Sequence, residues 1–256
     1  MTVHVVSSYK EAFERLESII RSFEQIYSVK LSYIETSISF PKLYATEKFL
    51  ELEKLAIVLK KTLTENYDLP IVAITTGSEY FVIDGHHRCY AKYISGRSSV
   101  KAFRIFFRNY FPRFKYTWNS MEIITTNERL PKEYDYWKTI IKYVEYYRRI
   151  YGKSVLVKYG RAYVDKLVPT QPFIEKSKVR TLMKEREFIN PIVVLEFGGK
   201  YYIVDGHARA YIAHIRGKES IEAIVLKMKH IPELAPGTVR TAELLALKSI
   251  RNIKIL

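Results

Sequence analysis

One nine-residue stretch occurs twice in this chain of 256 residues. It reads Val-Ile-Asp-Gly-His-His-Arg-Cys-Tyr over residues 82–90 and Ile-Val-Asp-Gly-His-Ala-Arg-Ala-Tyr over residues 203–211. The copies lie 121 residues apart, and the same offset pairs Pro70 with Pro191. A constant offset that extends beyond one motif is typical of an internal duplication. The sequence therefore predicts two copies of one fold.

Each copy predicts a strand, a tight turn and a helix. The residues before each Asp are apolar and rich in aromatic and β-branched side chains, as in a buried strand. Asp84 and Asp205 are expected to be helix N-caps, because their carboxylates can accept hydrogen bonds from the first N–H groups. Gly85 and Gly206 permit a sharp turn and the close approach of a ligand.

This turn has the properties of an anion site. The free N–H groups and the dipole of a helix start favour negative charge, while the following His and Arg add an imidazole and a cation. A plain capped helix is the alternative interpretation, but it does not require His and Arg twice. The predicted phosphate-binding residues are Gly85, His86, Arg88, Gly206, His207 and Arg209. The predicted catalytic residues are Asp84, His86, His87, Asp205 and His207, and the two Asp could also help to hold a divalent ion.

The second copy carries a resemblance to a known superfamily. Its Pro-Ile-Val-Val at 191–194, its Asp-Gly-His-Ala-Arg turn and its opening segment 163–171 resemble the ParB/sulfiredoxin-like fold. The resemblance covers residues 155–228 well and 30–107 less well. It implies an α/β (α+β) protein of two units, each a small sheet with packed helices. It also implies that the Gly-His-x-Arg turn holds the phosphates of ADP, ATP or CTP, with Mg²⁺.

Members of that superfamily differ in function, and the chain departs from several of them. Sulfiredoxins place Cys where this chain has His86 and His207, which argues against peroxiredoxin repair. Partition proteins continue into a helix-turn-helix, and no such segment follows residue 228.

Free-serine kinases carry a catalytic Glu shortly after the Pro of the opening turn. That position reads Gln171 in the second copy. It falls at Pro41 in the first copy when residues 33–35 are aligned with residues 163–165. The segment Lys-Tyr-Thr-Trp at 115–118 is nevertheless similar to one in those kinases. The carboxylates left to serve as a base are Glu35 or Glu47 in the first copy and Asp165 or Glu175 in the second.

The segment from Arg97 to Asn119 combines six basic residues and eight aromatic rings with no acidic residue. Cations and exposed rings are what single-stranded nucleic acid needs for phosphate contact and base stacking. In the alternative interpretation most rings are core and the cations are solvated, which the alternation over 100–107 favours for that part. The predicted nucleic-acid contacts are Arg104, Arg108, Arg113, Lys115 and Trp118.

Composition limits the partner and the compartment. The net charge is +15, from 42 basic and 27 acidic residues, which favours a polyanionic partner, with DNA as the first expectation. Two Gln and 21 Tyr suggest a thermophilic protein. A single Cys and the absence of a long apolar run or signal-peptide pattern predict a cytoplasmic protein that does not enter a membrane.

These observations predict three segments and a ranked pair of functions. Residues 1–120 form the first unit, residues 121–154 a helical link and residues 155–256 the second unit. The leading hypothesis is a ParB-like nucleic-acid-binding protein with nucleotide-phosphate sites at its two turns, with or without nuclease activity. The alternative is a nucleotide-dependent kinase of a small hydroxyl substrate such as free serine. No dedicated metal site is expected.

Overall fold

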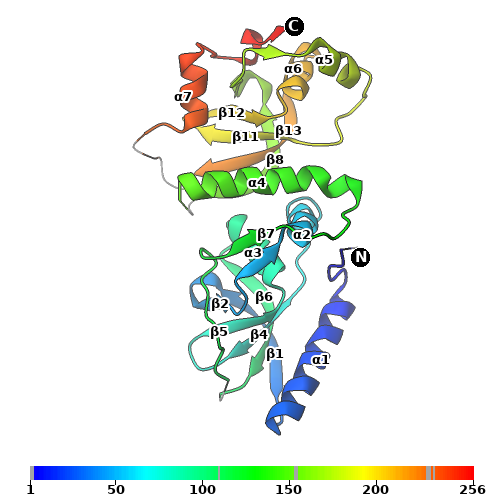
Figure 1. Cartoon of the computed structure of the whole chain (residues 1–256), viewed down its shortest axis with the longest axis vertical. Coiled ribbons are helices and arrows are strands. Elements are labelled where there is room, and N and C mark those ends of the chain that lie inside the picture. Colours follow the sequence, from blue (N-terminus) through cyan, green and yellow to red (C-terminus); the bar gives the residue numbers. More distant parts are fainter. Residues whose placement is uncertain (1–2, 109, 153–154, 229–231, 233) are drawn as a thin grey trace. The chain divides into compact units, whose positions relative to one another are not determined.

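Each motif copy lies in a five-stranded sheet, and the two sheets have the same strand order (Figure 1). The orders are β1-β6-β4-β5-β2 and β8-β13-β11-β12-β9. The computed structural model describes residues 3–108, 110–152, 155–228, 232 and 234–256. Contacts divide the chain into two units, residues 1–141 and 142–256. Among the described residues, none of the helices has an apolar stretch of membrane-spanning length.

The first unit and the helix that follows it contain these elements. Its strands are β1 (Ser32–Ser39), β2 (Leu43–Ala45), β3 (Phe49–Glu51), β4 (Ile71–Thr75), β5 (Tyr80–Asp84), β6 (Ser99–Phe106) and β7 (Glu122–Ile124). Its helices are α1 (Tyr9–Tyr27), η1 (Phe40–Lys42), α2 (Leu52–Thr64), α3 (His86–Ile94), η2 (Lys132–Tyr134) and α4 (Asp135–Ile150), which crosses into the second unit.

The second unit repeats much of this order. Its strands are β8 (Val155–Tyr163), β9 (Leu167–Val168), β10 (Phe173–Ile174), β11 (Ile192–Phe197), β12 (Lys200–Asp205), β13 (Ser220–Met228) and β14 (Lys254–Ile255). Its further helices are η3 (Val164–Lys166), α5 (Lys176–Met183), α6 (His207–Ile215), α7 (Gly237–Leu244) and η4 (Ile250–Asn252).

Strand register confirms the duplication and the α/β class. Ile71 of β4 pairs with Ala102 of β6, and Ile192 of β11 pairs with Ala223 of β13, each 121 residues later. The antiparallel β4–β5 ladder shifts register after Val72, and the β11–β12 ladder shifts at the corresponding place. A shared bulge turns both motif strands in the same way just before the Asp-Gly turn.

The opening strands obey a different offset. Ser39 of β1 pairs with Ser99, and Tyr163 of β8 pairs with Ser220. Tyr163 therefore corresponds to Ser39, 124 residues earlier, and the alignment of Tyr163 with Tyr33 is wrong. The three extra residues of the first unit lie between Glu51 and Pro70, where α2 has 13 residues and α5 has 8.

Helices cover both faces of the first sheet. Ala12, Leu16 and Phe23 of α1 pack on Phe103 and other apolar residues of β4 and β6. Helix α3 packs against β4 and β6 from the other face and contacts α2 (Figure 1). Strand β4 is therefore covered by helices on both faces of the sheet, which explains why all of its residues are buried.

Helix α4 lies where the sequence predicted a helical link between the two units, but it is part of the second repeat. It ends five residues before β8, as α1 ends five residues before β1. The offset of 124 places four apolar positions of α1 on buried positions of α4. The pairs are Phe13 with Trp137, Leu16 with Ile140, Ile20 with Val144 and Phe23 with Tyr147. The helix thus belongs to the second repeat by sequence, although contacts divide it after Ile141.

A two-stranded parallel sheet follows in each unit. β3 pairs with β7, and β10 pairs with β14. The pairing of β7 puts residues 122–124 in the first unit, so the predicted boundary at residue 120 is too early. The sequence did not predict these strands, because each of them has only two or three residues.

Candidate functional site

The first Asp-Gly-His turn is held together by an arginine. Gly85, and not Asp84, is the N-cap of α3, with a φ of 97° that side-chain-bearing residues rarely adopt. The Asp84 carboxylate instead accepts from Arg88 Nη2, and Arg88 Nη1 donates to the Pro70 carbonyl oxygen. The predicted N-cap role of Asp84 is therefore wrong, because the guanidinium one turn along the helix takes its carboxylate.

The second turn repeats this arrangement. Gly206 is the N-cap of α6 with a φ of 93°, and Asp205 accepts from Arg209 Nη2 at 2.8 Å. Arg209 Nη1 also donates to the Pro191 carbonyl oxygen at 2.9 Å. Arg88 and Arg209 are thus supports of their turns. The sequence predicted direct contact with a phosphate for both, and only the N–H groups of each guanidinium that do not bind these partners could make it.

The first histidine of each motif is buried and neutral. Nε2 of His86 accepts from the Thr46 N–H at 3.2 Å, and Nε2 of His207 accepts from the Thr170 N–H at 3.0 Å. Burial lowers the pKa of each imidazole to about 4. A neutral ring that accepts at Nε2 carries its proton on Nδ1. Each histidine therefore offers one N–H donor and no positive charge near pH 7.

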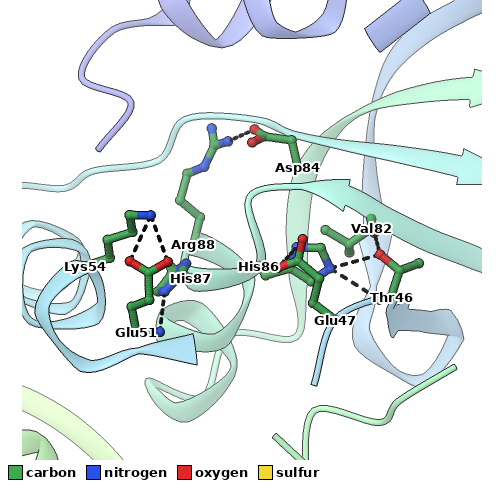
Figure 2. A network of polar contacts seen from close by, with 9 residues as sticks. All are labelled: Thr46, Glu47, Glu51, Lys54, Val82, Asp84, His86, His87 and Arg88. Carbon is green, nitrogen blue, oxygen red and sulfur yellow. Dashed lines mark hydrogen bonds and ion pairs between the residues drawn. The ribbon is translucent and has the colours of Figure 1, made fainter. Parts of the chain in front are cut away.

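Glu47 lies beside His86 in the first unit (Figure 2). Its Oε2 is 3.6 Å from His86 Nδ1, and its side chain is 63% exposed. Partial desolvation, followed by the negative charge of Asp84, raises the pKa of Glu47 above its usual value. The offset of 124 matches Glu47 with Gln171. The residue of the first copy that is equivalent to Gln171 is therefore Glu47, and the alignment that placed Pro41 there is wrong.

His87 joins the site from the next position of α3. Its Nε2 accepts from the Glu51 N–H at 2.9 Å, so its proton also lies on Nδ1. Burial and the charge of Lys54 lower its pKa to about 3. Lys54 in turn pairs with Glu51 at 2.9 Å (Figure 2). The second copy has Ala208 in place of His87.

These side chains surround a cavity of about 320 Å³. Its lining includes Glu47, Glu51, Lys54, Asp84, Gly85, His86, His87 and Arg88, together with His4, Arg15 and Tyr67. The second unit has a corresponding cavity of about 390 Å³. Its lining includes Gln171, Glu175, Lys178, Asp205, Gly206, His207, Ala208 and Arg209.

The sequence contained a signal for these additional residues. At an offset of 124, Thr46 matches Thr170, Glu51 matches Glu175 and Lys54 matches Lys178. These matches are not in register at an offset of 121, because the three extra residues of the first unit come between them and the motif. Of the other proposed carboxylates, Glu35 lies on β1, where it accepts from the Tyr9 hydroxyl. Asp165 lines a different cavity of its unit.

The predicted nucleic-acid residues do not form one uniform surface. Trp118 is only 3% exposed and donates from Nε1 to the Leu43 carbonyl oxygen at 2.8 Å, so its predicted role as a stacking platform is wrong. Lys115 pairs with Glu79 at 2.6 Å. Arg104 is half-buried with its guanidinium 4.3 Å from the centre of the Phe106 ring.

Exposed cations and exposed rings lie close together in the part of the basic segment that follows β6. Arg108 and Arg113 are exposed, and Arg113 lies over the Phe114 ring at 5.2 Å. Phe111 is 85% exposed and Phe114 is 48% exposed. Phosphate contact and base stacking therefore remain predictions only for Arg108, Phe111, Arg113 and Phe114.

Comparison with known proteins adds no functional assignment. No family model matches the chain. It is 32% identical over 108 residues to an uncharacterized protein of Methanocaldococcus jannaschii, a match that covers 41% of this chain and 40% of that protein. A crystal structure of an Agrobacterium tumefaciens protein covers 39% of this chain and 62% of its own, at 16% identity and a TM-score of 0.29. The structure of a conserved hypothetical protein of Pyrococcus furiosus matches 85% of this chain and 77% of its own chain, at 11% identity and a TM-score of 0.23.

Proposed function

We propose that the cavity of the first unit transfers a phosphoryl group from a nucleotide to the hydroxyl of a small substrate such as free serine. The observation that carries this proposal is Glu47, a carboxylate with a raised pKa beside a turn suited to phosphate. The leading hypothesis from the sequence, nucleic-acid binding, becomes the second candidate. The order changes because strand pairing places Glu47, and not Pro41, at the position equivalent to Gln171, and because Glu47 lies beside His86.

The chemistry requires a base and a phosphate cradle. The substrate hydroxyl oxygen forms a bond to phosphorus, the bond to the leaving oxygen of the nucleotide breaks, and Glu47 takes the hydroxyl proton. A raised pKa makes Glu47 a stronger base than an ordinary carboxylate. The first N–H groups of α3 face the phosphates, because the start of a helix favours negative charge.

The neighbouring side chains position these groups. The N–H at Nδ1 of His86 faces the Glu47 carboxylate and orients it without adding positive charge. Arg88 holds Asp84 and the carbonyl of Pro70, which fixes the turn that carries the phosphate donors. Such positioning is the main contribution of a protein to phosphoryl transfer.

A Mg²⁺ ion would be held mainly by the nucleotide. This ion usually binds through one or two carboxylates together with substrate phosphates. Within the described residues, no group of three or more acidic, His or Cys side chains forms a dedicated cage. Glu51, which lines the same cavity, is a carboxylate that could complete its coordination while Glu47 serves as the base. When bound, the ion would neutralise charge on the transferring group.

The pH dependence of the transfer tests the proposal. We expect phosphorus NMR to detect a phosphorylated product when the protein is incubated with serine, Mg²⁺ and ADP, ATP or CTP. Glu47 must be deprotonated to act, so the rate should rise with pH through an acid limb. Because the pKa of Glu47 is raised, the midpoint of that limb should lie above 4.5. Absence of product with all three nucleotides, or a rate without an acid limb, would contradict the proposal.

The second candidate function rests on the exposed rings and cations of residues 108–114. Alanine at both Arg108 and Arg113 should weaken binding of a labelled single-stranded oligonucleotide. The slope of log affinity against log salt should become less steep by about 0.7 per lost phosphate contact. Alanine at Lys115, which is paired with Glu79, is the control and should have less effect. Equal affinities for wild type and the double variant would remove this candidate.

A further inference from the structure

The second unit contains a cavity in which the polar contacts around the turn repeat those of the first cavity, with two replacements among the residues near the turn. Thr170 donates to His207 as Thr46 donates to His86, and Asp205 pairs with Arg209 as Asp84 pairs with Arg88. The ion pair of Glu175 with Lys178 repeats that of Glu51 with Lys54. The two replacements are Gln171 for Glu47 and Ala208 for His87.

Both replacements affect groups that face the ligand. Gln171 has nearly the shape of Glu47, but it is uncharged and cannot take a proton near neutral pH. Ala208 removes the imidazole that partly fills the first cavity, and the second cavity is larger, at about 390 Å³ against about 320 Å³. The second cavity therefore keeps its supporting contacts and lacks the base.

His207 provides an independent indication that this cavity takes a ligand. It is 8% exposed, and its Nε2 accepts from Thr170, so the proton lies on Nδ1. In the first unit the corresponding nitrogen faces Glu47. Within the part of the chain that the structure describes, His207 Nδ1 has no hydrogen-bond partner. His207 lines the cavity, so an anionic ligand there can accept from this N–H.

We infer that the second unit binds a nucleotide through its phosphates and does not transfer the phosphoryl group. The inference rests on the proposed function for the class of ligand. Three groups face the phosphates: the N–H groups at the start of α6, the His207 Nδ1–H and the Gln171 amide. Because Gln171 is neutral, this cavity lacks the charge repulsion that Glu47 exerts on a phosphate in the first unit.

Calorimetric titration of the full chain with the Mg²⁺ complexes of ADP, ATP and CTP tests the inference. We expect two binding events for the preferred nucleotide. Ala208→Phe should fill the second cavity and remove one event, and His87→Phe should remove the other. Gln171→Glu keeps the size of the side chain and adds a negative charge. It should weaken the second event by about fivefold or more, the scale of one like-charge contact near a surface.

The outcomes separate this inference from the proposed function. A single event that persists in Ala208→Phe and in Gln171→Glu, and is lost in His87→Phe, would overturn the inference while transfer activity remained. Two events without any phosphorylated product would support the inference and refute the proposed function. No binding of any of the three nucleotides would overturn both. Circular dichroism of each variant checks folding, and Gln171→Glu is the variant least able to disturb it.

Discussion

Replacing Glu47 with Gln should lower the rate of phosphoryl transfer by about 100- to 10,000-fold, the range for removal of a general base. The amide retains the size of the side chain and keeps a carbonyl oxygen that can face His86 Nδ1, so the cavity should keep its shape. What it loses is the ability to take the proton of the substrate hydroxyl. Nucleotide affinity should therefore be retained, or increase, because a negative charge has left the cavity.

Glu35→Gln is the matched control for this substitution. Glu35 also carries a carboxylate in the first unit, but it lies on β1, where it accepts from the Tyr9 hydroxyl. Its replacement should leave the transfer rate within about twofold of wild type, as expected for a surface change outside the site. Steady-state rates of both variants, measured with the same nucleotide and serine, test whether Glu47 is the base. A Glu47→Gln protein with the wild-type rate would exclude Glu47 as the base.

Replacing Gly85 with Ala should destabilise the first unit more than any other glycine substitution tested there. The new Cβ would lie 2.7 Å from Ile71 Cγ2 and 3.0 Å from Arg88 Nε, in a residue with a φ of 97°. The backbone conformation alone costs about 1–3 kcal/mol. The clash adds about 1–3 kcal/mol, since Ile71 is fully buried and the guanidinium is held by Asp84 and Pro70.

Gly77→Ala separates these two costs. Gly77 has nearly the same φ, 99°, but a Cβ there would meet nothing within 4 Å. Denaturation in urea can be followed by the fluorescence of the two tryptophans of the chain, of which Trp118 reports on the first unit and Trp137 lies on α4. The difference in unfolding free energy between the two variants should be the clash term. Equal destabilisation would mean that the turn relaxes around the extra methyl group.

The turn itself was predictable because its determinants are local. A strand, a Gly with positive φ and a helix start follow one another within ten residues, and each is specified by residue type. The same is true of α1, whose apolar residues recur at helical spacing over Tyr9–Tyr27. The duplication was also predictable, because the offset of 121 extends through three strands.

The hydrogen-bond partners of the polar side chains were harder to predict from the sequence. Asp84 is a favourable N-cap residue by type, yet its carboxylate is bound by Arg88 one helical turn away. Trp118 lies in a basic and aromatic segment that suggests an exposed surface, yet its indole bonds to Leu43 in the core. In both cases the competing partner is chosen by packing, which residue type alone does not determine.

The sequence by itself determined that two strand–turn–helix units of one kind exist and that each presents an Asp-Gly-His-x-Arg turn. Only the tertiary structure decided which carboxylate faces that turn. The three extra residues of the first unit change the offset from 121 to 124, and strand pairing is what identifies the equivalent positions on either side of them. Glu47 reaches His86 because the parallel pairing of β2 with β5 brings the end of one strand beside the end of the other. That contact joins residues almost forty positions apart, a separation that periodicity and local propensity do not resolve.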